Sequence, residues 1–177
     1  METDTTKKTP KPRYRKPAAV AMLEEMQRQH RIEQHPNVPP NYIKRVPMRD
    51  DTANGLTQCI VLFVNLTGGQ AERINTTGRV VMRRGQQLRG GRLVDCLRPQ
   101  YIPTNGRRGS ADISATIGGR SVKIEVKIGR DRQSDAQREY QHEVEQAGGL
   151  YYIARDFTSF YDWYNTTFPA SAHCKQQ

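Results

Sequence analysis

Three charged side chains on two neighbouring segments have the types and spacing needed to hydrolyse a phosphodiester bond. Asp112 lies in one alternating stretch of apolar and polar residues, and Glu125 and Lys127 lie in the next. Two carboxylates that face each other across strands repel, and a hard divalent ion such as Mg²⁺ between them removes the repulsion. The ion would polarise a phosphoryl oxygen and lower the pKa of a bound water, while Lys127 would orient that water or neutralise charge on the phosphate.

A diglycine turn decides whether these side chains meet. Residues 118–119 are both glycine, and a two-residue turn there pairs Asp112 with Glu125 across the strands. Lys127, two residues beyond Glu125, then lies on the same face, about 7 Å along the strand. A three-residue loop would shift the pairing by one and separate the carboxylates by face. The alternative interpretation is an exposed sheet face with ordinary charges, whose Lys–Glu pair contributes little.

The segments around these residues predict an α/β fold with a small mixed β-sheet flanked by helices. Strict alternation over residues 111–117 and 121–128 predicts two half-buried strands. Apolar residues at three- and four-residue steps over 54–66 predict a helix with one apolar stripe. The other expected elements are a helix over 134–146 that opens with the capping-box spacing Ser134-x-x-Gln137, a short buried strand over 151–154 and an aromatic-rich helix over 158–166.

The two ends of the chain have weaker patterns. Residues 1–50 predict a flexible basic tail, with a short helix near 17–34 and an extended, proline-rich linker over 36–50. We expect the folded domain over 51–168 and a C-terminal tail over 169–177. The helix near 17–34 is short of apolar residues, so it is expected to dock on a partner at most.

The middle of the chain is strongly basic. Two short strands are expected over 70–74 and 79–83, with turn signals at Asn75 and Gly78, and the Gly/Arg-rich residues 84–110 predict an irregular loop. All cations between residues 51 and 110 are arginines, whose planar fork matches phosphate oxygens better than lysine does. With a net charge of +10 for the whole chain, this composition favours a nucleic-acid partner. Arg107 and Arg108, just before the site, and Lys123, on the same strand face as Glu125, are the candidates for phosphate contacts.

Several classes of protein are not supported. No apolar run reaches the roughly 18 residues that a membrane span needs, and no apolar segment follows the basic N-terminus, as a secretory signal would require. The three cysteines are isolated, so neither a zinc ribbon nor a disulfide framework is predicted. We therefore expect an intracellular protein.

The motifs around the site resemble the PD-(D/E)XK nuclease superfamily. The residues that carry the resemblance are Gly109-Ser110-Ala111-Asp112, then Glu125-Val126-Lys127, then Ser134-x-x-Gln137 on a helix. More narrowly, this order is similar to the VRR-NUC branch, and the resemblance covers residues 54–155. It implies a restriction-endonuclease-like fold, in which Ala111 replaces the proline of the motif.

The resemblance also implies roles for individual residues. Asp112 and Glu125 would be metal ligands, with the Val126 carbonyl as a third, and Lys127 would be the catalytic lysine. Gln137 would reach from its helix toward the site or the DNA, although its capping box accounts for it equally well.

One family feature is missing. Many members carry a glutamate on the leading helix that helps to hold metal, and residues 54–66 contain none. Asn54 and Gln58 are the nearest polar residues on that helix, and Glu72 on the following strand is a third candidate to replace it.

From these observations we predict a Mg²⁺-dependent endodeoxyribonuclease, with Mn²⁺ as an alternative metal. The resemblance suggests branched or junction DNA as substrate, in the cytoplasm of a bacterial cell or a phage-infected host. A homodimer would let two sites cut both strands, and the helix near 17–34 could dock on a helicase or replication protein. The competing hypothesis is a binding module with a nuclease-like fold that grips nucleic acid without cutting it.

Overall fold

The computed structural model describes residues 14–75, 79–102 and 106–169, which fold into a mixed α/β structure. Residues 1–13 of the predicted N-terminal tail, residues 170–177 of the predicted C-terminal tail and the turn signal at Gly78 lie outside these ranges. The elements are α1 (Ala18–Gln34), α2 (Ala53–Leu66), β1 (Gln70–Arg73), β2 (Arg79–Arg89), β3 (Arg92–Ile102), β4 (Ile113–Ile117), β5 (Arg120–Val126), α3 (Asp135–Gln146), β6 (Leu150–Ala154) and α4 (Phe157–Thr167). All the predicted helices and strands are present, with ends shifted by one or two residues, except that the strand predicted over 79–83 continues to Arg89.

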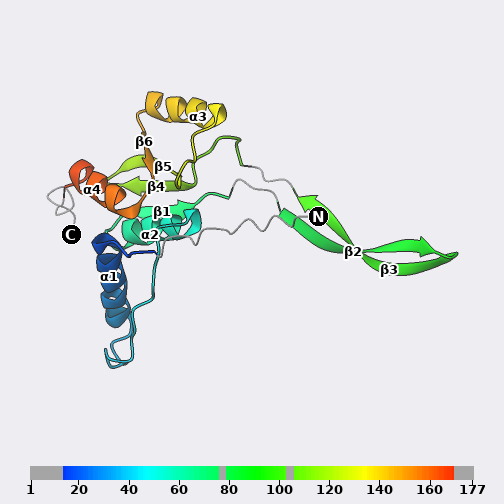
Figure 1. Cartoon of the computed structure of the whole chain (residues 1–177), viewed down its shortest axis with the longest axis horizontal. Coiled ribbons are helices and arrows are strands. Elements are labelled where there is room, and N and C mark those ends of the chain that lie inside the picture. Colours follow the sequence, from blue (N-terminus) through cyan, green and yellow to red (C-terminus); the bar gives the residue numbers. More distant parts are fainter. Residues whose placement is uncertain (1–13, 76–78, 103–105, 170–177) are drawn as a thin grey trace, which may run out of the picture.

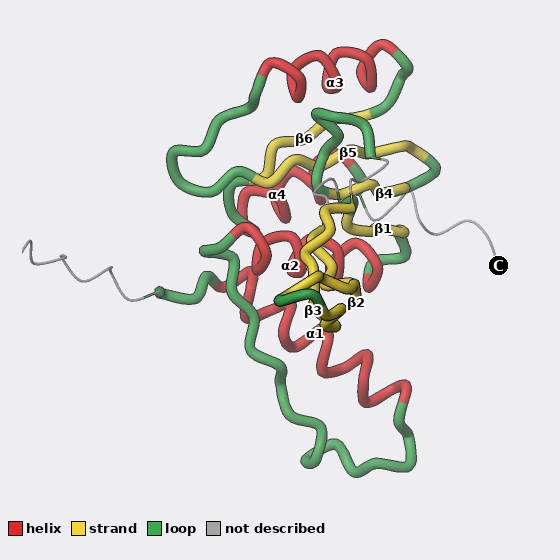
Figure 2. Tube along the Cα trace, turned by 90° about the vertical axis from the view of Figure 1, so that its right-hand side faces the viewer, coloured by secondary structure: helices red, strands yellow, loops and turns green. Residues whose placement is uncertain are grey.

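A four-stranded mixed sheet lies at the centre, in the order β1-β4-β5-β6. β1, β4 and β5 are antiparallel neighbours, whereas β6 runs parallel to β5. A parallel neighbour needs a crossover connection, and α3 provides it. Figures 1 and 2 show α3 on one side of the sheet and α2 and α4 on the other.

Alternation along the strands gives the sheet one apolar face, which forms the core. Ile113 and Ile117 of β4 and Val122 and Ile124 of β5 are completely buried there. Helices α2 and α4 supply the other half of the core, and their buried aromatic rings pack edge-on: Phe63 against Phe157, Phe160 and Tyr164. The predicted apolar stripe of the leading helix and the aromatic C-terminal helix are both confirmed as core elements.

The helix ends follow from local capping. Thr52 accepts a hydrogen bond from the Gly55 N–H at the start of α2, and Asp156 accepts one from the Ser159 N–H at the start of α4. At α3, Ser134 and Gln137 form the predicted capping box, in which each side chain accepts a hydrogen bond from the backbone N–H of the other. These caps satisfy donors that the first helical turn leaves unpaired.

The prediction that residues 1–50 form a flexible tail is wrong for the residues described, 14–50. Val20 and Leu23 of α1 are completely buried in the same core as the sheet. Glu24, also buried, accepts hydrogen bonds from the Lys16 ammonium at 2.6 Å and the Met48 N–H at 2.7 Å. Two well-placed apolar residues and one buried carboxylate therefore suffice to attach a helix whose overall pattern is weak.

The expected linker over 36–50 is likewise attached to the domain. The Arg28 guanidinium donates to the carbonyls of Ile43 and Pro40, and the Asp50 carboxylate accepts the N–H of Phe157 at the start of α4. The Tyr14 hydroxyl donates to the same carboxylate at 2.8 Å. The folded unit thus begins well before Asp51.

The prediction of an irregular loop over 84–110 is also wrong for most of its length. Strands β2 and β3 pair in register from Arg79↔Ile102 to Arg89↔Arg92, closed by Gly90 and Gly91. Both glycines have positive φ, 56° and 78°, as a tight two-residue hairpin turn requires. This two-stranded ribbon extends away from the rest of the molecule (Figure 1). Many side chains on both faces of the ribbon are polar or exposed. The ribbon sequence therefore lacks the strict alternation of apolar and polar residues that predicts a half-buried strand.

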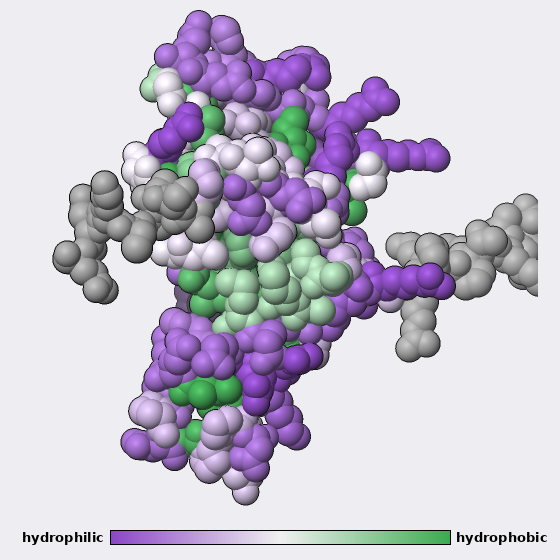
Figure 3. All heavy atoms as spheres, turned by 90° about the vertical axis from the view of Figure 1, so that its left-hand side faces the viewer, coloured by the Kyte–Doolittle hydropathy of each residue, from purple (hydrophilic) through white to green (hydrophobic). Residues whose placement is uncertain are grey.

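The surface of the remaining fold is mostly hydrophilic. On the face shown in Figure 3, hydrophobic side chains gather in the middle of the molecule between hydrophilic regions above and below. Within the part of the chain that the structure describes, no helix is both long and apolar enough to cross a membrane.

Candidate functional site

The β4–β5 hairpin has the register predicted from its diglycine turn. Ile117 pairs with Arg120 and Ile113 with Ile124. On the polar face, the Lys123 ammonium donates to the Ser114 hydroxyl of the opposite strand at 2.6 Å. Asp112 lies two residues before Ser114 and Glu125 two residues after Lys123, so both share this polar face.

Asp112 is fixed at the point where β4 begins. One of its carboxylate oxygens accepts the Val126 N–H at 2.9 Å, and its backbone carbonyl accepts the Ile74 N–H at 2.7 Å. The side chain therefore bonds to β5, the strand that carries Glu125. This contact leaves the second oxygen of Asp112 available for another partner.

Glu125 is almost completely buried, with 1% of its surface exposed. Its Oε1 accepts hydrogen bonds from the Gln137 amide and from the Lys127 ammonium, the latter at 3.1 Å. Its Oε2 is buried and has no hydrogen-bond partner among the described residues. Burial raises the pKa of Glu125, and the nearby charge of Asp112 raises it further, while the hydrogen bond from Lys127 acts in the opposite direction.

Lys127 is buried between two carboxylates. Its ammonium lies 3.1 Å from Glu125 and 3.5 Å from Asp131, and its backbone N–H donates to the Ala154 carbonyl of β6. Burying an isolated ammonium is costly, and these two carboxylates offset part of that cost. Asp131 was not predicted from the sequence, although its position four residues after Lys127 could have suggested it.

Gln137 performs both of the roles that the sequence left open. Its side-chain oxygen accepts the Ser134 N–H and closes the capping box, while its amide nitrogen donates to Glu125. One side chain thus connects the start of α3 to the buried carboxylate. Tyr151 of β6, which sequence reasoning did not place here, lies near the same group: burial raises the pKa of its hydroxyl, and the charge of Glu125 raises it further.

The donor set fits a hard divalent cation. Because the Lys127 N–H points to β6, the Val126 carbonyl on the same trans peptide points the opposite way, toward Asp112. That carbonyl, the free Asp112 oxygen and the unpartnered Glu125 Oε2 are oxygen ligands of the kind Mg²⁺ takes. Across the described residues, no group of three or more His, Cys, Asp or Glu side chains is placed to hold a metal ion. A cation here would therefore depend on two carboxylates, a carbonyl and water.

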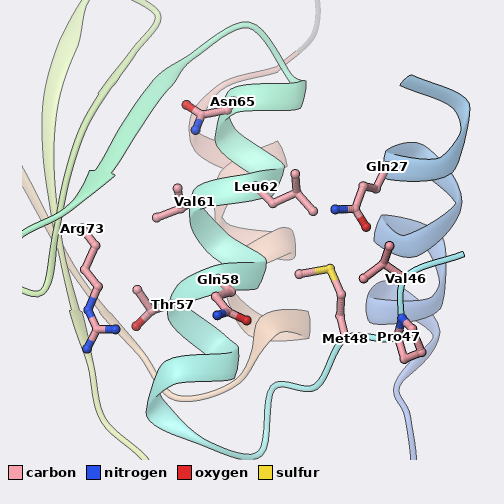
Figure 4. Close-up of a pocket in the computed structure, with 10 residues that line it drawn as sticks. All are labelled: Gln27, Val46, Pro47, Met48, Thr57, Gln58, Val61, Leu62, Asn65 and Arg73. Atoms are coloured by element: carbon pink, nitrogen blue, oxygen red, sulfur yellow. The ribbon is translucent and has the colours of Figure 1, made fainter. Parts of the chain in front are cut away.

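Only one of the three candidate replacements for the missing helix glutamate shares this face. Glu72 pairs with Ser114 across β1 and β4, so it lies on the polar side of the sheet and is exposed. Gln58 instead lines a cavity of about 490 Å³ between α1, the segment over 46–48 and α2 (Figure 4). Arg73, the neighbour of Glu72, lines the same cavity, which therefore belongs to the other side of the sheet. Asn54 is exposed in the first turn of α2.

The predicted phosphate-binding residues differ in whether their side chains already have partners within the protein. Arg107 forms an ion pair with Glu143 of α3, with one hydrogen bond of 2.6 Å, and lies 5.7 Å from the centre of the Tyr140 ring. Its guanidinium holds the pKa of Glu143 below the usual value. Arg108 is exposed and has no side-chain partner among the described residues. The Lys123 ammonium is engaged by Ser114, on the same face as Glu125.

Comparison with known proteins adds no relative to this picture. No protein-family model, no curated protein and no solved structure matches the chain. The functional argument therefore depends on the geometry of the site itself.

Proposed function

We propose that this protein is a metal-dependent nuclease that hydrolyses DNA phosphodiester bonds, with Mg²⁺ as its metal and Mn²⁺ as an alternative. One observation carries the proposal: a buried glutamate with a free oxygen, next to an aspartate and a buried lysine on one sheet face. A protein gains nothing in stability by burying a carboxylate oxygen without a partner, so a function is the better explanation.

The order of elements supports a restriction-endonuclease-like fold and the resemblance to the VRR-NUC branch. Around the site the chain runs helix, three antiparallel strands, helix and parallel strand, as α2-β1-β4-β5-α3-β6. The β2–β3 ribbon is an insertion between β1 and β4. Asp112, Glu125, Lys127 and Gln137 come from three of these elements or their ends and converge at one end of the sheet.

Each residue of the candidate site has a role in this proposal. Asp112, Glu125 and the Val126 carbonyl would hold Mg²⁺, which supplies a Lewis acid that polarises the phosphoryl oxygen and acidifies a water. Lys127 keeps a positive charge where negative charge develops on the phosphate during hydrolysis. Gln137 fixes the rotamer of Glu125, and the Val126 N–H fixes that of Asp112.

Plasmid and branched-DNA cleavage with Mg²⁺ tests the proposal. We expect Asp112→Ala and Lys127→Ala to abolish cleavage, whereas Asp162→Ala on the exposed side of α4 and Lys44→Ala leave it intact. Omitting the metal should have the same effect as Asp112→Ala. Equal cleavage by all four variants and the wild type would refute the assignment.

A second candidate function is a nucleic-acid-binding module with the same fold and no catalysis. The lack of a glutamate on α2 and of any three-ligand acidic group among the described residues favours it. Calorimetric titration with Mg²⁺ separates the two: a nuclease site binds the ion and loses it in Asp112→Asn, whereas a pure binding module shows no such dependence.

A further inference from the structure

The β2–β3 ribbon has two chemically different faces. In its register, Arg83 pairs with Arg98, so these two arginines lie directly opposite each other on one face. We call this the arginine face; its described side chains are Val81, Arg83, Gln87, Arg92, Val94, Cys96, Arg98, Gln100 and Ile102. The opposite face carries the apolar residues Val80, Met82, Leu97 and Tyr101, each more than half exposed, and one described arginine, Arg84, which pairs with Leu97.

The cations of the ribbon are not neutralised within the protein. No carboxylate of the described chain lies within ion-pair distance of Arg83, Arg92 or Arg98, whereas on the surface of the rest of the fold Arg49 and Arg107 pair with Asp51 and Glu143. The one acidic residue on the ribbon, Asp95, lies on the apolar face and accepts a hydrogen bond from Gln86. Like charges directly opposite each other destabilise a strand pair. An anionic partner would remove this repulsion.

The shape of the ribbon suits one kind of polyanion. Each strand has 11 residues, and at about 3.4 Å per residue the ribbon spans close to one turn of B-DNA. A two-stranded ribbon fits the major groove of duplex DNA. Arg98 is arranged for such a contact: its stem lies over Gly85, where a side chain is absent, and its guanidinium donates to the Gln86 carbonyl. These contacts fix the Arg98 guanidinium against the ribbon and direct it toward Gly85 and Gln86, away from Arg83.

The ribbon is inserted in the sequence between two strands of the central sheet, next to the candidate site. β1 leads into the ribbon and β4 follows it, and at this junction the Ile74 N–H donates to the carbonyl of Asp112. The ribbon therefore directly precedes, in the sequence, the strand at whose start Asp112 lies.

From these observations we propose that the arginine face of the β2–β3 ribbon is a duplex-DNA-binding surface, in which Arg83 and Arg98 contact backbone phosphates. The inference rests on the proposed function only in the choice of DNA as the ligand. A protein that binds duplex DNA through this face without cutting it would satisfy the inference equally. Among the described side chains, the arginine face carries Arg83, Arg92 and Arg98 and no carboxylate, whereas the opposite face carries both Arg84 and Asp95, so the positive charge favours the arginine face as the DNA-binding surface.

Fluorescence anisotropy with a labelled 30-base-pair duplex in EDTA buffer tests the surface without any cleavage. The full chain is compared with Arg83→Gln/Arg98→Gln and with Arg31→Gln/Arg120→Gln, which removes two charges from α1 and from the β4–β5 turn. We expect the ribbon variant to bind at least about tenfold more weakly at 0.1 M salt, with a salt slope reduced by about 1 per arginine. The control should stay within about threefold of wild type, because charges far from the contact are screened.

Three results would overturn this inference. They are a ribbon variant with wild-type affinity and slope, a control that loses as much as the ribbon variant, and a wild-type protein that binds no duplex at 50 mM salt. None of them concerns catalysis, so the nuclease proposal is judged separately by the Asp112 and Lys127 variants. Conversely, loss of ribbon binding in a protein that cuts no DNA would support the surface and refute the nuclease.

Discussion

The polar face of the central sheet and the β2–β3 ribbon both concentrate charge, but they hold it in opposite ways. At the sheet, Glu125 and Lys127 are buried, paired and fixed by α3 and β6. On the ribbon, Arg83, Arg92 and Arg98 are exposed and lack acidic partners among the described residues. Preorganised charge in a buried site suits chemistry, because it acts at low dielectric and does not have to reorganise during the reaction. Exposed charge suits binding, since it attracts a polyanion and releases counterions.

The largest expected effect distinguishes the two regions by kinetics. Lys127→Met should lower the single-turnover cleavage rate by about 10²- to 10⁴-fold, because it removes a fixed cation from the reacting phosphate. DNA affinity should change by no more than about threefold, since Lys127 is buried and the ribbon is intact. Rapid-quench cleavage and anisotropy on the same preparation measure both quantities. A variant that loses affinity in proportion to rate would place Lys127 in binding and remove the contrast between the regions.

A matched pair of leucines should show that only one region contributes to folding. Leu23→Ala in α1 should cost about 2–5 kcal/mol, because it opens a cavity in the core, whereas Leu97→Ala on the ribbon should cost less than about 0.5 kcal/mol. Urea denaturation followed by circular dichroism gives both values. Similar values for the two variants would mean either that α1 is only loosely docked or that another surface covers Leu97.

Metal-free stability should reveal the cost of burying Glu125. Its pKa is raised in the folded protein, so the folded state holds the proton more tightly than the unfolded state, and stability falls as pH rises from 4.5 through the folded pKa. Glu125→Gln should therefore be more stable than wild type at pH 8 in EDTA and lose this advantage below pH 4.5. Mg²⁺ should raise the melting temperature of wild type but not of the variant.

The exposed carboxylate on the same face provides the control for that experiment. Glu72→Gln should leave the pH dependence of stability close to that of wild type. If Glu125→Gln were less stable than wild type at pH 8, the pairing of Glu125 with Lys127 would outweigh its burial, and the site would be structural.

The smallest expected effect separates the two roles of Gln137. Ser134→Ala removes the N-cap of α3 and should cost about 1 kcal/mol, with little change in Mg²⁺ affinity. Gln137→Ala removes the cap contact and also frees Glu125, so it should lower Mg²⁺ affinity as well. Thermal denaturation and calorimetric metal titration measure the two effects. Equal Mg²⁺ affinity in both variants would reduce Gln137 to a helix cap.

Much of the sheet and its site could be predicted from the sequence. The strands β4 and β5 alternate strictly because each buries one face, and a two-residue glycine turn fixes their register. Asp112 and Glu125 follow from that register alone. The ribbon has the same kind of turn at Gly90–Gly91, but it buries neither face, so its side chains show little alternation and it was mistaken for a loop.

The sequence by itself determined which residues face the same side of a strand and where helices begin, because both depend on neighbours a few positions apart. Only the tertiary structure decided that Gln137 and Asp131 close around Glu125 and Lys127, that Arg107 is held by Glu143, and that α1 belongs to the core. These contacts join residues whose proximity depends on how α3, β6 and α1 pack against the sheet. Packing is a property of complementary surfaces, and no local pattern along the chain encodes it.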